Sequence, residues 1–317
     1  MLGISVVIPT YNRADMIRET LDALFAQTRV PDEVIVVDDG SQDSTPAVLA
    51  SYGARLKTLR IRNSGELVAR NIGLGLARGH LVAFCDNDDL WLPDFLAAMS
   101  AQWRTEPGLL ACYSDFSILR GSTVSARSKF EDAPAGYWSD LRAAGPDSGM
   151  FDHAIAERLL AFQPFFPSCM MVHRDAFAAA GGWDETVGIG SDFATVLRVA
   201  ARPPIGVVRR PLVHIRKHAD NYSGDTEQTN LRDARVLDHV LATRPELAPL
   251  AAVIRASAAE RRAAALDSAF TRGDFAAVNA IRRLLPRGAR TPRQVVKCAI
   301  AGLPPGLARA AASIASR

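Results

Sequence analysis

The chain has 317 residues, of which 48% are hydrophobic and 22% are charged. This composition excludes a disordered or fibrous protein, and the length suits one large domain with an appendage or two domains. The net charge of +3 hides a basic region, because residues 244–317 carry 13 Lys and Arg against 4 Asp and Glu. Such a region suits an anionic membrane surface, a nucleic acid or an acidic partner, although solvated arginines on ordinary helices would also explain it.

None of the four cysteines has a neighbour at the spacing of a zinc site or a disulfide framework, so we expect a reduced, cytoplasmic setting. The N-terminus lacks the basic and apolar segments of a secretory signal. Residues 295–315 are apolar, but Lys297, two prolines and Arg309 interrupt them, so we expect no spanning helix. If the protein meets a membrane, we expect peripheral contact at the inner face.

The first hundred residues alternate short β-branched runs with segments of helical period, which is typical of βαβ units and a parallel sheet. The run at 81–85 is wholly apolar, as in strands that are covered on both faces. Gly79 is predicted to end the helix before it. The predicted elements are strands at 4–8, 34–37, 56–61 and 81–85, and helices around 14–25, after Pro46 and at 67–78.

The remainder of the chain is less regular. Residues 115–163 have mixed periodicity, and their elements cannot be ordered from the sequence. Beyond Asp225, Ala, Leu and Arg recur at helical spacing, which predicts a helical extension with breaks at prolines and at Gly273. The predicted elements between these parts are strands at 107–114, 169–172 and 207–215, and helices at 175–180 and 195–201.

Two predicted strands run directly into acidic residues, at 38–39 and at 86–89. Open α/β sheets bind ligands beyond the carboxyl ends of their strands. Three carboxylates among residues 86–89 repel one another, and Mg²⁺ or Mn²⁺ between them would relieve that repulsion. Capping of the helix near Pro93 is the alternative, but it needs only one carboxylate, such as that of Asp89. The acidic residues at 86–89 therefore predict a cation site.

Other readings of these segments are weaker or remain open. An EF-hand loop that starts at Asp86 fails, because Trp91 stands where the turn glycine belongs. Asp39 could accept hydrogen bonds from a ribose or a base, or could simply form a turn with Gly40. A lysine phosphate loop, a paired-histidine motif and a serine elbow are all missing, which disfavours kinases, dehydrogenases, metalloproteases and esterases.

Four segments of the sequence, in order and at compatible spacing, resemble the donor-binding half of family-2 glycosyltransferases with a GT-A fold. They are VVIPTYN at 6–12, VVDDGS at 36–41, ARN at 69–71 with Gly79, and FCDNDDLW at 84–91. The resemblance implies an α/β GT-A fold, with a mostly parallel central sheet flanked by helices and a C-terminal helical extension. The division that follows is a donor-binding half at 1–105, an acceptor-binding half at 106–225 and a basic helical extension at 226–317.

The resemblance also implies roles for residues near the strand ends. Asp86 and Asp88 would be the flanking acids of a DXD motif, with Asp88 binding Mn²⁺ or Mg²⁺ and Asp86 contacting the donor ribose or sugar. On residue chemistry alone, Tyr11 could stack on a base or fill the core, and Arg70 could pair with phosphate or Asp or lie on a solvated helix face. The nucleotide-binding residues implied by the resemblance are Pro9, Thr10, Tyr11, Asn12, Arg13, Asp39, Arg70, Asp86 and Asn87.

Further along, GGWDE at 181–185 and GSD at 190–192 are similar to the acceptor-side region of this family, where an acidic pair supplies the catalytic base. Ser191 stands in place of the usual Glu, which leaves Asp192 as the base. From the residues alone, Asp192 would be a helix N-cap. The resemblance also implies donor or acceptor contacts for Trp183 and Asp184.

A stretch that contains His214, His218, Asn221 and Ser223 looks like the flexible C-terminal loop of the family's catalytic domain. His218 could reach the metal or the diphosphate, since an imidazole suits that environment. A lone surface histidine is the alternative interpretation.

We therefore expect an inverting, metal-dependent transferase that moves a sugar from a nucleotide-diphosphate donor, with UDP-sugars favoured. The acceptor hydroxyl would belong to a glycan or a lipid-linked acceptor in bacterial cell-surface polysaccharide or lipid-linked glycan synthesis, with no nucleic acid partner. A nucleotide-sugar-binding module without turnover is one alternative, for which Ser191 is the hint. A sugar nucleotidyltransferase is another, but residues 9–13 lack its Gly- and Lys-rich loop.

Overall fold

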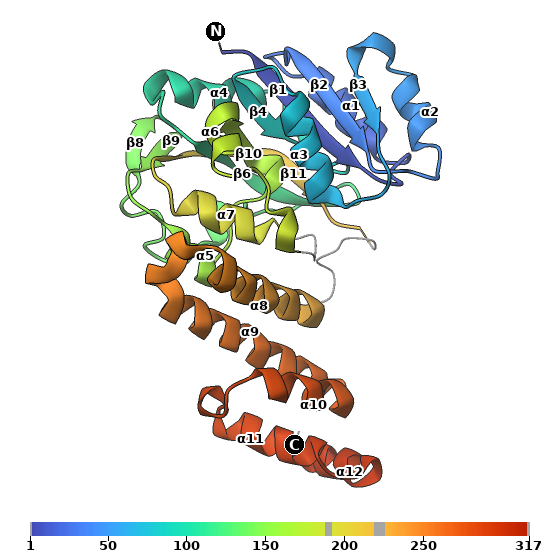
Figure 1. The fold of residues 1–317 in the computed structure, drawn as a ribbon, viewed down its shortest axis with the longest axis vertical. Helices are drawn as coiled ribbons and strands as arrows, with labels where there is room; N and C mark the ends of the chain where they lie inside the picture. Colours follow the sequence, from blue (N-terminus) through green and yellow to red (C-terminus); the bar gives the residue numbers. More distant parts are fainter. Residues whose placement is uncertain (1, 188–191, 219–225, 316–317) are drawn as a thin grey trace. The chain divides into compact units, whose positions relative to one another are not determined.

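Two compact units make up the chain, at residues 1–218 and 219–317. The computed structural model describes residues 2–187, 192–218 and 226–315 of these units. The first unit is α/β and the second is helical over its described residues (Figure 1). The strands of the first unit are β1 (Ile4–Thr10), β2 (Glu33–Asp38), β3 (Lys57–Arg60), β4 (Leu81–Phe84), β5 (Leu90–Trp91), β6 (Ala111–Arg120), β7 (Thr123–Val124), β8 (Arg142–Gly145), β9 (Ser148–Phe151), β10 (Met170–His173) and β11 (Ile205–Arg216).

The sheet has the strand order β3-β2-β1-β4-β10-β6-β11-β9-β8. The first four strands in this order pair parallel, β10 is antiparallel to both β4 and β6, and β6 pairs parallel with β11. This arrangement confirms the predicted α/β fold, with its parallel part built from the first hundred residues. The helices of the unit are α1 (Ile17–Phe25), α2 (Thr45–Ala50), α3 (Glu66–Leu76), α4 (Phe95–Thr105), α5 (Ala156–Ala161), α6 (Arg174–Ala179) and α7 (Phe193–Ala200).

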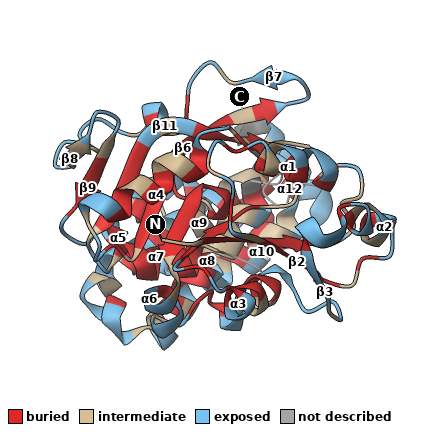
Figure 2. Ribbon diagram, turned by 90° about the horizontal axis from the view of Figure 1, so that it is seen from above, coloured by how far each residue is buried: buried red, intermediate tan, exposed pale blue. Residues whose placement is uncertain are grey.

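Helices cover both faces of this sheet, which explains the continuous apolar runs in β1 and β4. On one face, Val6 packs in a core with Leu21 of α1 and Phe95 of α4. On the other face, α3 lies so close that a Cβ on Gly73 would stand 2.3 Å from Cγ1 of Val7. The central strands are therefore buried, whereas β3 and β8 at the sheet edges are largely exposed (Figure 2).

The predicted role of Gly79 as a helix stop is wrong. The helix α3 already ends at Leu76, and the backbone of Gly79 is not left-handed. The glycine is needed instead for a close approach to β1, because a Cβ there would lie 2.6 Å from the backbone nitrogen of Ser5. Its own N–H donates a 2.8 Å hydrogen bond to Ser5 Oγ.

Hydrogen bonds to Glu33 link the parallel strands to one another. Its carboxylate accepts hydrogen bonds from Ser5 Oγ on β1, Lys57 Nζ on β3 and the backbone N–H of Arg78. Burial by itself would raise the pKa of Glu33, but these three donors lower it to about 2. The ionised carboxylate therefore fixes three segments of chain around the edge of the sheet that lies away from the acidic clusters.

The segment 115–163 has mixed periodicity because it holds the second half of β6, the short strands β7 to β9 and α5. The second unit confirms the predicted helical extension, and Gly273, with φ of +74°, ends its longest helix. No helix in the described parts of the chain is both long and apolar enough to cross a bilayer. The helices of this unit are α8 (Thr226–Thr243), α9 (Ala251–Thr271), α10 (Phe275–Leu284), α11 (Pro292–Ala301) and α12 (Pro305–Ala315).

Candidate active site

The two acidic clusters meet at one edge of the sheet because β1, β2 and β4 are parallel neighbours. Thr10 at the end of β1 pairs in register with Asp38 at the end of β2. On the other side of β1, Asn87 Nδ2 donates a 3.0 Å hydrogen bond to the carbonyl of Pro9. The carboxyl ends of three strands therefore bring the predicted nucleotide and metal residues together, as expected for open α/β sheets.

The loop after β1 is held by hydrogen bonds rather than by packing. The backbone N–H of Asn12 donates to Ser41 Oγ at 2.9 Å, and that of Arg13 donates to Thr45 Oγ1 at 2.9 Å. Asn12 itself is left-handed, with φ of +49°. Tyr11 is 41% exposed on this fixed loop, so it does not fill the core. Its ring is available to stack on a base, and this role stays a prediction.

Asp39 is buried, and both of its carboxylate oxygens accept backbone hydrogen bonds, from Ser64 at 2.7 Å and from Gly65 at 2.9 Å. These bonds fix the residues that lead into α3, so Asp39 positions that helix whether or not it also binds a ribose. The Oγ1 atom of Thr10 nearby is buried and has no hydrogen-bond partner within the described part of the chain. A buried hydroxyl without a hydrogen-bond partner destabilises the folded state unless a bound ligand forms a hydrogen bond with it.

Arg70 on α3 is the buried cation of the site. Its side chain is 2% exposed, so the interpretation of a solvated helix face is wrong. The guanidinium pairs with Glu66 one turn earlier and with Asp86, whose Oδ1 lies 2.5 Å away. Burial by itself would lower the pKa of Arg70, but the carboxylates of Glu66, Asp86 and Asp192 raise it above its ordinary value. Glu66 was not predicted from the sequence, although its i,i+4 spacing from Arg70 was the available signal.

Asp88 and His218 form a second pair in the site. Nε2 of His218 lies 3.0 Å from Asp88 Oδ2, and the two side chains are 14% and 17% exposed. His218 is therefore not a lone surface histidine. A carboxylate and an imidazole at this separation fit one divalent cation, and among the described residues no third such side chain joins them. The protein would thus supply two ligands, and substrate phosphates and water the others.

Asp89 has a structural role that differs from helix capping, the alternative to a cation site. It does not cap α4, whose N-cap is Asp94, and instead accepts a 3.0 Å hydrogen bond from the backbone N–H of Arg216. Burial and the neighbouring carboxylates of Asp88 and Asp86 raise its pKa well above the ordinary value. The repulsion among the three aspartates is thus relieved in part by the protein itself, through Arg70, His218 and the weaker ionisation of Asp89.

Ser168 is a further residue of the site that was not predicted from the sequence. Its Oγ accepts a 2.8 Å hydrogen bond from the backbone N–H of Asp86, and its carbonyl accepts one from Trp91 Nε1. This serine, from just before β10, therefore fixes the first residue of the acidic cluster. No sequence pattern marks it, because the contact joins residues that are 82 positions apart.

Asp192 occupies the N-cap position of α7, but its side chain makes no capping hydrogen bond. Helix capping therefore does not account for this carboxylate. Its charge raises the pKa of both Arg70 and Tyr113, which places it in the same site as the acidic cluster. Ser191, which stands in place of the usual Glu, lies outside the described residues, as do Asn221 and Ser223.

Trp183 and Asp184 are buried, and Trp183 lies next to Arg70. Trp183 is 1% exposed, and its ring lies 4.9 Å from the Arg70 guanidinium and 4.9 Å from the ring of Phe84. The backbone of Trp183 exchanges two hydrogen bonds with the side-chain amide of Asn71 on α3. Asp184 is buried and accepts hydrogen bonds from Thr186. These contacts position Arg70, and direct ligand contacts of the pair stay predictions.

Known proteins resemble this chain over much of its length. The family model described as Glycosyl transferase family 2 matches residues 5–178, more than half of the chain. The putative glycosyltransferase EpsH of Bacillus subtilis (strain 168) is 27% identical over 222 residues, which cover 68% of this chain and 61% of that protein. Succinoglycan biosynthesis protein ExoO of Rhizobium meliloti (strain 1021) is 42% identical over 98 residues, which cover 30% and 28%. The chain thus spans less than two thirds of either relative.

Solved structures agree with the predicted fold. Residues 1-349 of S. aureus TarS match with a TM-score of 0.61 at 18% identity, covering 99% of this chain and 89% of that one. The mannosyltransferase PcManGT of Pyrobaculum calidifontis matches with a TM-score of 0.53 at 22% identity, covering 98% and 86%. These likenesses show a GT-A fold, and with the family model they confirm the resemblance seen in the sequence. The chain belongs to glycosyl transferase family 2.

Proposed function

We propose that this chain transfers a sugar from a nucleotide-diphosphate donor, with UDP-sugars favoured, to a hydroxyl of a glycan or lipid-linked acceptor, with inversion, in bacterial polysaccharide or lipid-linked glycan synthesis. The observation that carries the proposal is the convergence of Arg70, Asp86, Asp88, His218 and Asp192 on one site of a family-2 chain. A nucleotidyltransferase is disfavoured by the family to which the chain belongs.

The donor is proposed from the structural neighbours. TarS has been crystallised in complex with UDP-GlcNAc, and PcManGT with GDP-Man and Mn²⁺. In this chain, the exposed ring of Tyr11 and the carboxylate of Asp39 would hold the nucleoside between β1 and β2. The similarity to succinoglycan biosynthesis protein ExoO supports a polysaccharide product.

We propose that Asp88 and His218 hold a divalent cation, Mn²⁺ or Mg²⁺, at the end of β4. When bound, the cation would neutralise charge on the departing diphosphate. Arg70 and Asp86 act together beside it, because the buried guanidinium holds the Asp86 carboxylate in one orientation. A fixed carboxylate can accept hydrogen bonds from the donor ribose or sugar hydroxyls, which orients the sugar for attack.

Asp192 is the proposed general base. It would accept the proton of the acceptor hydroxyl while that oxygen attacks the anomeric carbon from the face opposite the diphosphate. Its side chain starts α7 without a capping bond, so the carboxylate is not consumed by the helix that carries it. The proposed single displacement needs one base and no carboxylate nucleophile, so it is compatible with a serine at position 191.

The first experiment is a thermal-shift screen of the whole chain against UDP-, GDP- and dTDP-sugars with Mn²⁺. A donor at 100 times its Kd stabilises the folded state by about 2.7 kcal/mol, which corresponds to a rise in Tm of roughly 5–10 °C. We expect EDTA or Asp88→Asn to abolish most of the rise. Asp94→Asn is the matched control, because it changes an exposed carboxylate on the far side of β5, at the start of α4.

A rise in Tm without any release of nucleotide diphosphate would instead support the binding module without turnover. If no nucleotide sugar raises the Tm of the unmodified chain, the donor proposal is wrong. If the rise is the same in EDTA and in Asp88→Asn, donor binding stands but the cation does not contribute to it.

A lipid surface is the proposed partner of the second unit. Residues 275–317 contain eight Lys and Arg and no Asp or Glu. The same helices expose large apolar side chains, which include Val295 at 53%, Val296 at 54% and Leu307 at 61%. Basic residues interspersed with exposed apolar ones favour adsorption to an anionic membrane, which would place a lipid-linked acceptor near the enzyme.

We expect the full chain to bind vesicles of phosphatidylcholine with phosphatidylglycerol and to bind pure phosphatidylcholine poorly. Substituting Arg287, Arg293 and Arg309 by Gln should weaken binding to anionic vesicles by roughly 3 kcal/mol, at about 1 kcal/mol per basic residue. The matched control substitutes three exposed arginines of the first unit, Arg78, Arg104 and Arg120. Equal loss in both triple variants, or equal binding to neutral vesicles, would contradict the proposal.

A further inference from the structure

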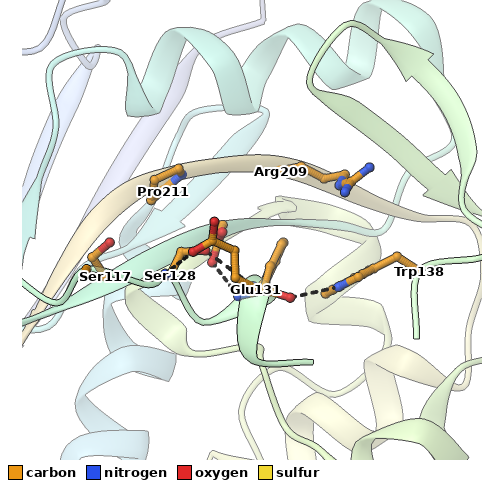
Figure 3. Close-up of a pocket in the computed structure, with 9 residues that line it drawn as sticks. Ser117, Ser128, Glu131, Trp138, Arg209 and Pro211 are labelled. Atoms are coloured by element: carbon orange, nitrogen blue, oxygen red, sulfur yellow. Dashed lines mark hydrogen bonds between the residues drawn. The ribbon is translucent and has the colours of Figure 1, made fainter. Parts of the chain in front are cut away.

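A cavity of about 380 Å³ lies in the first unit and is lined by none of the residues assigned above to the donor or the cation (Figure 3). Its size is in the range of small-molecule sites. In Figure 3 the Glu131 side chain lies between Ser117 at one end and Trp138 with Arg209 at the other. The lining residues used below are Asp115, Ser117, Ser128, Glu131, Trp138 and Arg209.

The floor of the cavity is fixed by a buried carboxylate. Asp115 on β6 is 2% exposed, and its Oδ1 accepts backbone hydrogen bonds from Phe116 at 2.7 Å and Phe130 at 2.9 Å. The second bond holds the 3₁₀ turn Phe130–Asp132 against the sheet. Glu131, within that turn, accepts a 2.8 Å bond from the backbone N–H of Ser128 through Oε2. The cavity is therefore built before any ligand binds, which lowers the entropic cost of binding.

One wall of the cavity is the indole of Trp138. Its Nε1 donates a 3.2 Å hydrogen bond to the carbonyl of Phe130, and the two ring centroids are 4.4 Å apart. The ring is partly exposed, whereas the other three tryptophans of the chain are at most 3% exposed. Trp138 thus presents a fixed apolar surface to the cavity, and it is the one tryptophan that a solute can reach.

The polar groups of the cavity complement hydroxyl groups. Glu131 is exposed and uses Oε2 within the turn, while no hydrogen bond of Oε1 is found among the described residues. The guanidinium of Arg209 is also exposed and has no ion-pair or hydrogen-bond partner among those residues. A hydroxyl can donate to the carboxylate and accept from the guanidinium. The cavity has two carboxylates, of Asp115 and Glu131, and only one arginine among its lining residues, so it would repel an anionic ligand. This charge balance disfavours nucleotides and acidic sugars.

The cavity and the proposed catalytic base border the same face of β6. Tyr113, Asp115 and Ser117 alternate along this strand and therefore point to one side of the sheet. The pKa of Tyr113 is raised by burial and by the charge of Asp192, so the base lies near the start of this row. Asp115 and Ser117 line the cavity at its continuation. The cavity therefore lies on the same side of β6 as the proposed base.

We propose that this cavity binds a neutral pyranose unit of the acceptor glycan, stacked on Trp138 and hydrogen-bonded to Glu131 and Arg209, beyond the unit that receives the new sugar. The proposal rests on the proposed transferase function and adds to it that the acceptor is an oligosaccharide. The apolar C–H face of a pyranose matches the indole, and its equatorial hydroxyls match the charged pair.

The test uses the full chain without donor, and neutral trisaccharides of glucose, galactose, mannose and N-acetylglucosamine as probes. Saturation-transfer NMR measures binding, and mass spectrometry after N-bromosuccinimide treatment measures oxidation of Trp138. We expect at least one trisaccharide to bind and to protect Trp138, while the corresponding monosaccharide-6-phosphates do not. Trp138→Ala should weaken binding roughly tenfold or more.

Two further variants keep the test independent of folding. Glu131→Gln preserves the bond from Ser128 and should still weaken binding, and Arg209→Gln should do the same, whereas Arg120→Gln on the neighbouring strand should not. The proposal is overturned if no trisaccharide protects Trp138, or if the cavity variants bind as well as the unmodified chain. Donor-induced thermal shifts, measured in the same variants, should be unchanged. A chain that binds trisaccharides but no nucleotide sugar would refute the transferase proposal and leave this site in place as a glycan-binding site.

Discussion

Replacing Asp192 with Asn is expected to lower the rate of sugar transfer roughly a thousandfold, because general-base catalysis contributes about 10²- to 10⁴-fold. The amide is nearly the same size but cannot accept the proton of the acceptor hydroxyl at neutral pH. The side chain makes no capping bond to α7, so the loss should be far larger in kcat than in stability. The measurement is release of nucleotide diphosphate from the nucleotide sugar that gives the largest thermal shift, with acceptor glycan present.

The matched control is Asp175→Asn, which removes a carboxylate from the first turn of α6 without touching the site. Donor binding should be the same in both variants and in the unmodified chain. Transfer at more than about a tenth of the normal rate in Asp192→Asn would assign the base elsewhere, because the effect would then fall below the range of general-base catalysis. A fall in kcat for both variants would point to a nonspecific effect of helix-terminal charge.

Replacing Arg70 with Leu is expected to lower the free energy of unfolding by about 3 kcal/mol, because removing one partner of a buried ion pair leaves the other uncompensated. Arg70 is 2% exposed, and its partner Asp86 is 27% exposed. The double variant Arg70→Leu with Asp86→Asn should recover part of the loss, since the stranded charge is then gone. Urea denaturation of the two single variants and the double variant measures the coupling.

The conservative control is Arg70→Lys, which keeps the charge but loses the planar guanidinium whose Nη2 contacts both Glu66 and Asp86. It should destabilise less than Leu and still impair donor binding. A cost below 1 kcal/mol for Arg70→Leu would show that solvent screens the pair. Additive losses in the double variant would show that Arg70 and Asp86 do not stabilise each other.

Much of the first unit was predictable because its signals are local. Apolar runs flanked by turn residues mark β1, β2 and β4, and their covered faces follow from the continuity of those runs. The convergence of residues 38–39 and 86–89 follows from the parallel order of the strands. The helical extension was also visible, since its breaks lie at glycine and proline.

Residues 115–163 could not be ordered in advance, and the physical reason is their surroundings. The strand β6 has neighbours of opposite direction, β10 and β11, and it carries Asp115 on a fully buried position. A buried carboxylate looks like a loop signal in a sequence, and only the backbone N–H groups of Phe116 and Phe130 make it compatible with a core. The cavity beside it therefore had no sequence signature.

The sequence by itself determined the family, the order of the first four strands' segments and the acidic residues at their ends, because each of these depends on neighbours within a few positions. The tertiary structure decided which charges pair. Arg70 lies 16 positions from Asp86, and His218 lies 130 positions from Asp88. Coulombic and hydrogen-bond energies depend on distance in space, so these partners, and the relief they bring to three adjacent aspartates, became visible only when the sheet brought them together.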